Sequence, residues 1–158
     1  MSHAMLDEID RKILAALQAD GRMTNVELAK LVGLTAPPCL RRVKALEERG
    51  IIRSYHADLD GEALGYGITV FAMVSLKSQA EADLTAFEAH VQSLPEVREC
   101  YMLNGEIDFL LKVVARDLQS FQQFLTSKLT PAPNVASVKT SLTIRKAKSE
   151  TGVPVKLA

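Results

Sequence analysis

The chain has 158 residues, of which 47% are hydrophobic and 24% charged, and its formal net charge is zero. This composition is typical of a globular protein. The sequence contains no run of about 18 apolar residues, which is the length needed to span a membrane. Cys39 and Cys100 lack metal-ligand spacing, so we expect buried, reduced thiols in a cytoplasmic protein without a metal site or cofactor. We find no signal peptide and interpret residues 1–4 as a cloning remnant before a natural start at Met5.

Three short helices and a strand are predicted at the start of the chain. Helical spacing of apolar residues, capping signals and glycine stops place the helices at about 7–19, 24–32 and 35–49. Residues 51–57 are predicted to form a strand. This order, with a tight turn between the second and third helices, predicts a winged helix-turn-helix domain over residues 5–57.

The third predicted helix would present a basic face. At 100° per residue, Arg41 and Lys44 fall opposite its apolar side, and Arg42 lies beside them. Arginine can contact guanine or clamp a phosphate, and lysine or an N-terminal threonine can bind phosphate. The alternative is an ordinary solvated helix face. The predicted DNA-contacting residues are Thr35, which we expect to cap the helix, Pro37, Pro38, Arg41, Arg42, Lys44 and, on the wing, Arg53.

A linker over residues 58–67, rich in turn residues, precedes a second domain over 68–148 and a tail over 149–158. The second domain alternates between strand-like and helix-like segments in the order β-α-β-β-α-β, which is typical of a ferredoxin-like fold. Asn104 and Gly105 predict a tight hairpin turn. The strands are predicted at 68–77, 97–103, 107–115 and 135–144, and the helices on the apolar stripes of 84–94 and 118–129. The fold class is therefore α+β.

The strands of this second domain are apolar at nearly every position, which indicates burial on both faces of the sheet. The residues in question are Phe71, Met73, Phe109, Leu111 and Val113. The two helices of one chain cover only one face. We therefore expect a sheet-to-sheet homodimer, with larger assemblies possible.

The sequence from Thr24 to Ile52, with its Pro-Cys-Leu-x-Arg-Val core at 38–43, resembles the DNA-binding segment of the Lrp/AsnC (feast/famine) regulators. Residues 105–111 resemble the Gly-Asp-x-Asp hairpin of that family's sensor domain, with Glu106 where aspartate is usual. The resemblance covers about residues 6–148. It implies a transcriptional regulator that binds double-stranded DNA and assembles as dimers, often as tetramers of dimers (octamers).

The same resemblance implies a small-molecule effector, an amino acid or related metabolite, bound at interfaces between dimers, and control of amino-acid metabolism genes. Acidic side chains could accept hydrogen bonds from its ammonium group, and hydroxyls or a backbone N–H could donate to its carboxylate. For Gly105 and Asp108 the alternative is plain turn chemistry. Carried over by position, the effector residues are Asn104, Gly105, Glu106, Asp108, Leu118, Ser141, Leu142 and Thr143.

Two alternative functions are compatible with a chain of this shape. The first is a haem-pathway (sirohaem-type) decarboxylase of similar shape, which needs His, Arg or Tyr converging on a tetrapyrrole. The three histidines are His3, His56 and His90, and we expect His90 to face solvent. No triad, carboxylate pair or metal spacing is evident, so we predict that the protein is not an enzyme. The second is a ligand-binding assembly module without DNA binding, which the basic face disfavours.

Overall fold

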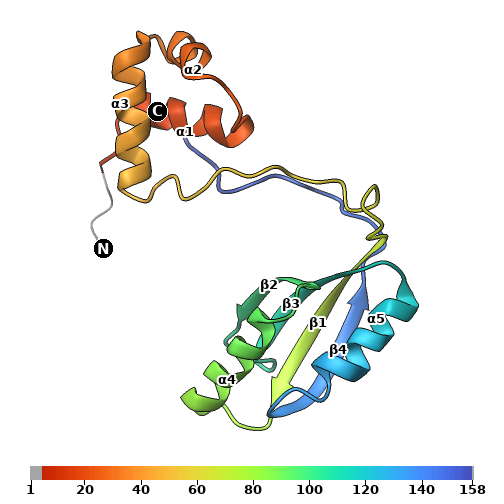
Figure 1. Ribbon diagram of the computed structural model, residues 1–158. Helices are drawn as coiled ribbons and strands as arrows, with labels where there is room; N and C mark the ends of the chain where they lie inside the picture. The colour runs from red at the N-terminus through yellow and green to blue at the C-terminus, as the bar shows by residue number, and fades with distance from the viewer. Residues whose placement is uncertain (1–4, 158) are drawn as a thin grey trace. The chain divides into compact units, whose positions relative to one another are not determined.

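A computed structural model describes residues 5–157, so the interpretation of residues 1–4 and of His3 lies outside the described part. The chain divides into two compact units (Figure 1). The first unit contains the residues up to Asp58 together with those from Lys148 onward, and the second unit is Leu59–Ala147. In the described residues, no helix is both long and apolar enough to cross a membrane.

The three predicted helices of the first unit are confirmed: α1 (Glu8–Ala19), α2 (Asn25–Val32) and α3 (Ala36–Glu48). Both α1 and α2 begin with a capping box, in which the N-cap side chain and the third helical residue bond each other's backbone N–H groups. The apolar faces of the three helices meet in one small core. Its fully or nearly fully buried members are Ile13, Leu28, Ala29, Val32, Cys39 and Leu46.

The predicted strand over 51–57 is wrong, because the structure has no strand there. The N–H groups of Ile51 and Ile52 donate to the carbonyl of Leu46 and so close the end of α3 (3.0 and 3.2 Å). Both isoleucine side chains pack on the core of the first unit. The β-branched side chains here contribute to the packing of the core. An extended segment forms a β-strand only where it hydrogen-bonds to a neighbouring strand.

The second unit has the predicted β-α-β-β-α-β order: β1 (Ile68–Leu76), α4 (Glu81–Gln92), β2 (Val97–Met102), β3 (Phe109–Ala115), α5 (Leu118–Phe124) and β4 (Val135–Leu142). Its four strands form one antiparallel sheet in the order β2-β3-β1-β4. This strand order is that of the ferredoxin-like fold, so β1 and β3 are central and β2 and β4 are edges. Before the sheet, residues 60–66 form a compact turn with Gly65 at φ 84°.

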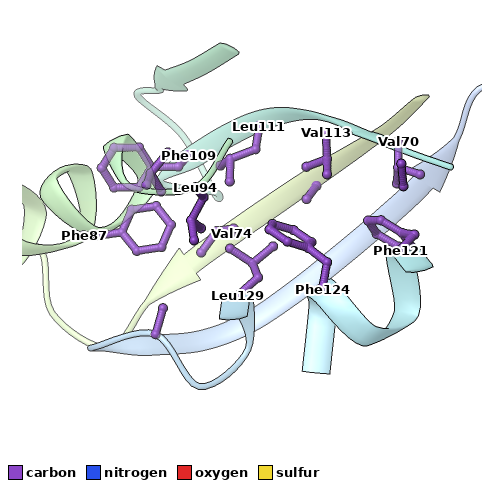
Figure 2. Packing of buried hydrophobic residues seen from close by; sticks show 14 of the residues in the cluster. Val70, Val74, Phe87, Leu94, Phe109, Leu111, Val113, Phe121, Phe124 and Leu129 are labelled. Carbon is purple, nitrogen blue, oxygen red and sulfur yellow. The ribbon is translucent and has the colours of Figure 1, made fainter. Parts of the chain in front are cut away.

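The core of the second unit lies between one face of the sheet and the two helices (Figure 2). Burial alternates along β1 and β3, as expected for strands covered on one side. Phe109 is fully buried and its ring packs on that of Phe87 at a centroid distance of 4.7 Å. Of the five apolar strand residues singled out above, Phe109, Leu111 and Val113 therefore face the helices, while Phe71 and Met73 lie on the other face.

That other face is apolar along its centre. Phe71 and Met73 on β1 are flanked across the ladder by Leu110 of β3, and all three are half-buried in the single chain. Lys112 and Glu99 add an ion pair at 3.0 Å. The homodimer expected from the sequence stays a prediction, for which this face is the candidate surface.

Three local features differ from the expectations. The β2–β3 hairpin exists, but Gly105 does not have the positive φ that a tight two-residue turn requires. Instead a longer loop is closed by the N–H of Leu103 donating to the carbonyl of Asp108 (2.8 Å). The last turn of the α5 stripe is a π-helix, η1 (Leu125–Leu129). His90 does not simply face solvent: it is half-buried, and its Nε2 lies 2.8 Å from the Lys128 carbonyl.

Candidate DNA-binding and effector sites

The exposed side of α3 carries the basic residues that were predicted to contact DNA. Arg41 and Lys44 are exposed and form no ion pair with any residue in 5–157. Pro37 is exposed in the first turn and Pro38 half-buried behind it. Arg53 is exposed, but on an irregular segment rather than a wing strand. Such a helix face suits the major groove, where arginine reads base edges and lysine binds phosphate.

Thr35 occupies the N-cap position of α3, but its side chain makes no capping hydrogen bond. The reason lies in the sequence, because an N-cap side chain bonds the N–H groups of the second and third helical residues. Those residues are Pro37 and Pro38, which have none. The Thr35 hydroxyl is exposed and remains available for a phosphate, whereas the two prolines supply no backbone donor.

Arg42 was predicted to flank the DNA-contacting face, and its contact with DNA stays a prediction; in the structure its guanidinium is paired within the first unit. Its Nη1 donates to Asp7 Oδ2 (2.7 Å) and to Asp10 Oδ1 (2.8 Å). These carboxylates are the two halves of the α1 capping box. Hydrogen bonds and ion pairs to them raise the pKa of Arg42. Arg42 therefore ties α3 to the start of α1, a non-local contact that helical phase alone does not reveal.

Stability of the first unit should fall in acid because of this ion-pair cluster. The Asp10 N–H and then the Arg42 guanidinium lower the pKa of Asp7 below its usual 3.8. Since the folded pKa is depressed, the stabilisation is complete above the usual pKa and is lost as pH falls through the folded value. Arg42→Ala should lower the free energy of unfolding at neutral pH and flatten this acid dependence, whereas Arg41→Ala, its matched control, should do neither.

Denaturant unfolding at neutral pH and at about pH 3 checks this prediction. The Arg42→Ala protein should keep part of its acid dependence, because the Asp10 N–H bond to Asp7 and the capping bonds that lower the pKa of Glu27 stay in place. Equal acid sensitivity of the two variants and the unchanged protein would show that the ion pairs add nothing to stability.

Two residues on the helix-turn-helix were not singled out from the sequence. Asn25 Nδ2 donates to the carbonyl of Ala36 (2.8 Å) and so fixes the start of α3 against α2. Leu40 is 42% exposed beside Arg41 on α3. An apolar side chain in this position can contact a thymine methyl group in the major groove. The sequence indicated the exposure of Leu40 only through its position around the helix, at the border between the apolar and the basic sides.

The predicted effector residues of the β2–β3 loop differ in exposure. Asn104, Gly105 and Glu106 are exposed, whereas Asp108 is half-buried. Asp108 Oδ2 accepts hydrogen bonds from the Leu76 N–H (2.7 Å) and from Gln79 Nε2 (3.4 Å). This carboxylate therefore ties the loop to the end of β1 through residues distant in sequence, so a structural contact, and not local turn chemistry, occupies one of its oxygens.

The other predicted effector residues lie at the opposite end of the sheet. Thr143 donates through both its N–H (3.0 Å) and its hydroxyl (2.8 Å) to the carbonyl of Thr69, near the start of β1. Leu118, Ser141 and Leu142 are exposed near this end. From Thr69 to Leu76 the chain advances roughly 23 Å at about 3.3 Å per residue. The two groups of residues cannot form one small-molecule pocket within a single chain.

Two hollows of the second unit lie elsewhere and are small. One of about 170 Å³ is lined by Glu88, Val91, Gln92, Cys100, Met102 and Phe109. This volume is below the usual range of about 300–1,000 Å³ for ligand pockets. Burial raises the pKa of the Cys100 thiol to about 11, and burial also raises that of Cys39. Neither thiol is therefore activated as a nucleophile.

Two known protein families match this chain. A winged helix-turn-helix DNA-binding family matches residues 6–53, and the Lrp/AsnC ligand binding domain family matches residues 69–153. The chain belongs to the Lrp/AsnC family of transcriptional regulators. It has the winged helix-turn-helix DNA-binding domain and the α+β ligand-binding domain of that family, as the sequence predicted.

Individual Lrp/AsnC relatives are similar over nearly the whole chain. The leucine-responsive regulatory protein of Rhizobium meliloti is 55% identical over 95% of this chain and 96% of its own length. The Bkd operon transcriptional regulator of Pseudomonas aeruginosa is 44% identical over 90% and 93%. A Neisseria meningitidis transcriptional regulator, solved as a complex with L-Met, is 39% identical over 95% and 97%, with a TM-score of 0.91.

Proposed function

We propose that this protein binds operator DNA through the exposed side of α3 and that an amino acid, bound between copies of the chain, adjusts that binding. The proposal depends on one observation above all: the two groups of candidate effector residues lie at opposite ends of the sheet. A pocket containing both can form only where the loop end of one copy meets the Thr143 end of another. An effector site of this kind couples ligand binding to assembly.

The chemistry of the effector is inferred from the relatives. One is named for its response to leucine, and another was solved with L-methionine bound. Both ligands combine an ammonium, a carboxylate and an unbranched or branched apolar side chain. In this chain the exposed Leu118 and Leu142 can contact such a side chain, and Ser141 can donate to the carboxylate.

A regulatory rather than enzymatic role is part of the proposal. Of the histidines that a tetrapyrrole enzyme would need, His56 is exposed and His90 bonds a main-chain carbonyl. Within residues 5–157 no cluster of three or more His, Cys, Asp or Glu is arranged to hold a metal ion. We also propose a homodimer through the open sheet face, assembled further into octamers, since the pocket requires additional contacts between copies.

A thermal-shift screen of the twenty amino acids tests the proposal, and we expect an apolar one such as L-leucine or L-methionine to bind. A ligand at a hundred times its Kd stabilises the folded form by about 2.7 kcal/mol, which raises the melting temperature by roughly 5–10 °C for a chain of this size. A mobility-shift assay on a duplex selected by the protein should then change with the same amino acid. Failure of all twenty to shift the melting temperature would reject an amino-acid effector.

Mixed assemblies test whether the pocket lies between copies. Glu106→Ala and Leu142→Ala chains should each lose ligand binding alone, because every pocket then lacks one half. Co-expression of the two should restore part of the binding, since some interfaces then combine two intact halves. A mixture that binds no better than either variant would place the site within one chain.

A further inference from the structure

The C-terminal segment lies along the outside of α1. Gln18 Nε2 donates to the carbonyl of Val153 (2.6 Å), and the N–H of Val153 donates back to Gln18 Oε1 (3.3 Å). Arg11 Nη1 donates to the carbonyl of Lys156 (3.4 Å). The described portion of the predicted tail over 149–158 is therefore a packed part of the first unit, as the division of the chain also indicates.

The contacts are spaced equally far apart on α1 and on the C-terminal segment. Arg11 and Gln18 are seven residues apart on α1, which corresponds to about 10.5 Å and two helical turns, so both point from one face. Val153 and Lys156 are three residues apart, about 10 Å in an extended chain. The segment runs antiparallel to the helix, and Val155 is half-buried between exposed neighbours. A short extended segment in register with one helix face is a specific fit.

Gly152 is adapted to this contact. Its φ of 67° lies in the left-handed region that favours glycine. A Cβ at this position would also collide with the side-chain amide of Gln18. Both the backbone and the close approach therefore favour glycine at the point where the segment meets α1.

The segment also anchors the second chain connection between the two units, which is the stretch that follows β4. The chain enters the second unit through residues 58–67 and leaves it after β4. At the exit, Thr143 bonds the carbonyl of Thr69 through both its N–H and its hydroxyl, so the entering and leaving segments are fastened together there. Docking of the residues from Lys148 onward on α1 fastens the other end of the leaving segment to the first unit.

We propose that residues 148–157 form a strap that restricts the movement of the DNA-binding helices, with Gln18 and Gly152 as its positioning residues. Without the strap, only the linker over 58–67 limits how far the first unit can reorient. With it, both chain connections are anchored. This role does not depend on the identity of the effector, so it can fail or hold independently of the proposed function.

Hydrogen exchange of the full-length protein tests whether the strap is docked. In Gln18→Ala, the amide of Val153, which loses its hydrogen bond to Gln18 Oε1, should exchange roughly fivefold to tenfold faster. Gln122→Ala, an exposed glutamine on α5 without a side-chain hydrogen bond among the described residues, is the matched control and should leave this exchange unchanged. Equal exchange in all three proteins would show that the segment is not docked.

Chymotrypsin cleavage tests whether docking restricts movement, because Tyr55, Leu59, Leu64 and Tyr66 are exposed cleavage sites in the linker region. Gln18→Ala should accelerate cleavage there several-fold. Gly152→Ala should do the same alone but add little in the Gln18→Ala background, because both changes release one contact. Faster exchange at Val153 without faster linker cleavage would overturn the strap as a restraint.

Discussion

Replacing Arg41 and Lys44 together by alanine should weaken specific DNA binding about a hundredfold while leaving assembly intact. These are the basic residues on the exposed side of α3 that are free of ion pairs within residues 5–157. A bidentate base contact contributes about 1–3 kcal/mol and a phosphate contact adds to the salt dependence, so a loss of about a hundredfold in affinity is expected. The affinity should also become less dependent on salt.

Fluorescence anisotropy on a duplex selected from a random pool by the unchanged protein measures both effects. The matched control is Lys77→Ala with Arg116→Ala, which removes two exposed positive charges from the second unit. This control should keep most of the affinity, because its charges lie outside the recognition helix. Equal losses in the two double variants would mean that net charge, and not the α3 face, determines binding.

Phe109→Ala should destabilise the second unit by about 3–5 kcal/mol, the usual cost of deleting a fully buried phenylalanine side chain. The ring is completely inaccessible and packs on Phe87. A domain of this size is stable by only about 5–15 kcal/mol, so much of its stability would be lost. If the open sheet face forms the dimer, the variant should also dissociate at concentrations where the unchanged protein stays assembled.

Leu46→Ala is the companion variant, because Leu46 is buried in the separate core of the first unit. It should cost about 2–5 kcal/mol there and leave the second unit folded. Urea unfolding followed by circular dichroism, with size-exclusion chromatography, distinguishes the two. A single transition shifted equally by both substitutions would show that the two cores unfold as one.

What could be predicted from the sequence was local. The α1–α3 helices, the Thr24 capping box and the β-α-β-β-α-β order depend on short-range periodicity and caps, and all are confirmed. The fate of residues 51–57 could not be predicted in this way, because β-branched residues suit both a strand and the closing turn of a packed helix. Strand formation requires a partner that local sequence does not specify.

In the candidate sites, too, local features could be predicted from the sequence and non-local contacts could not. The exposure of Arg41 and Lys44 follows from helical phase, and the structure agrees with it. The pairing of Arg42 with Asp7 depends on a contact between residues 35 apart in sequence, which phase cannot supply. Likewise, resemblance grouped Asp108 with Thr143 as one site, and only the strand register shows that they lie at opposite ends of β1.

The contacts between the C-terminal segment and α1 also bear on how the chain folds as it is synthesised. Gln18 and Val153 are separated by 135 residues, and Arg11 and Lys156 by 145. Ribosomal synthesis delivers the N-terminal helices first, so they must fold long before their C-terminal partner emerges. This contact can therefore form only after the whole second unit has been synthesised. A polypeptide released before residue 148 would carry its DNA-binding helices without the segment that bonds Arg11 and Gln18 of α1.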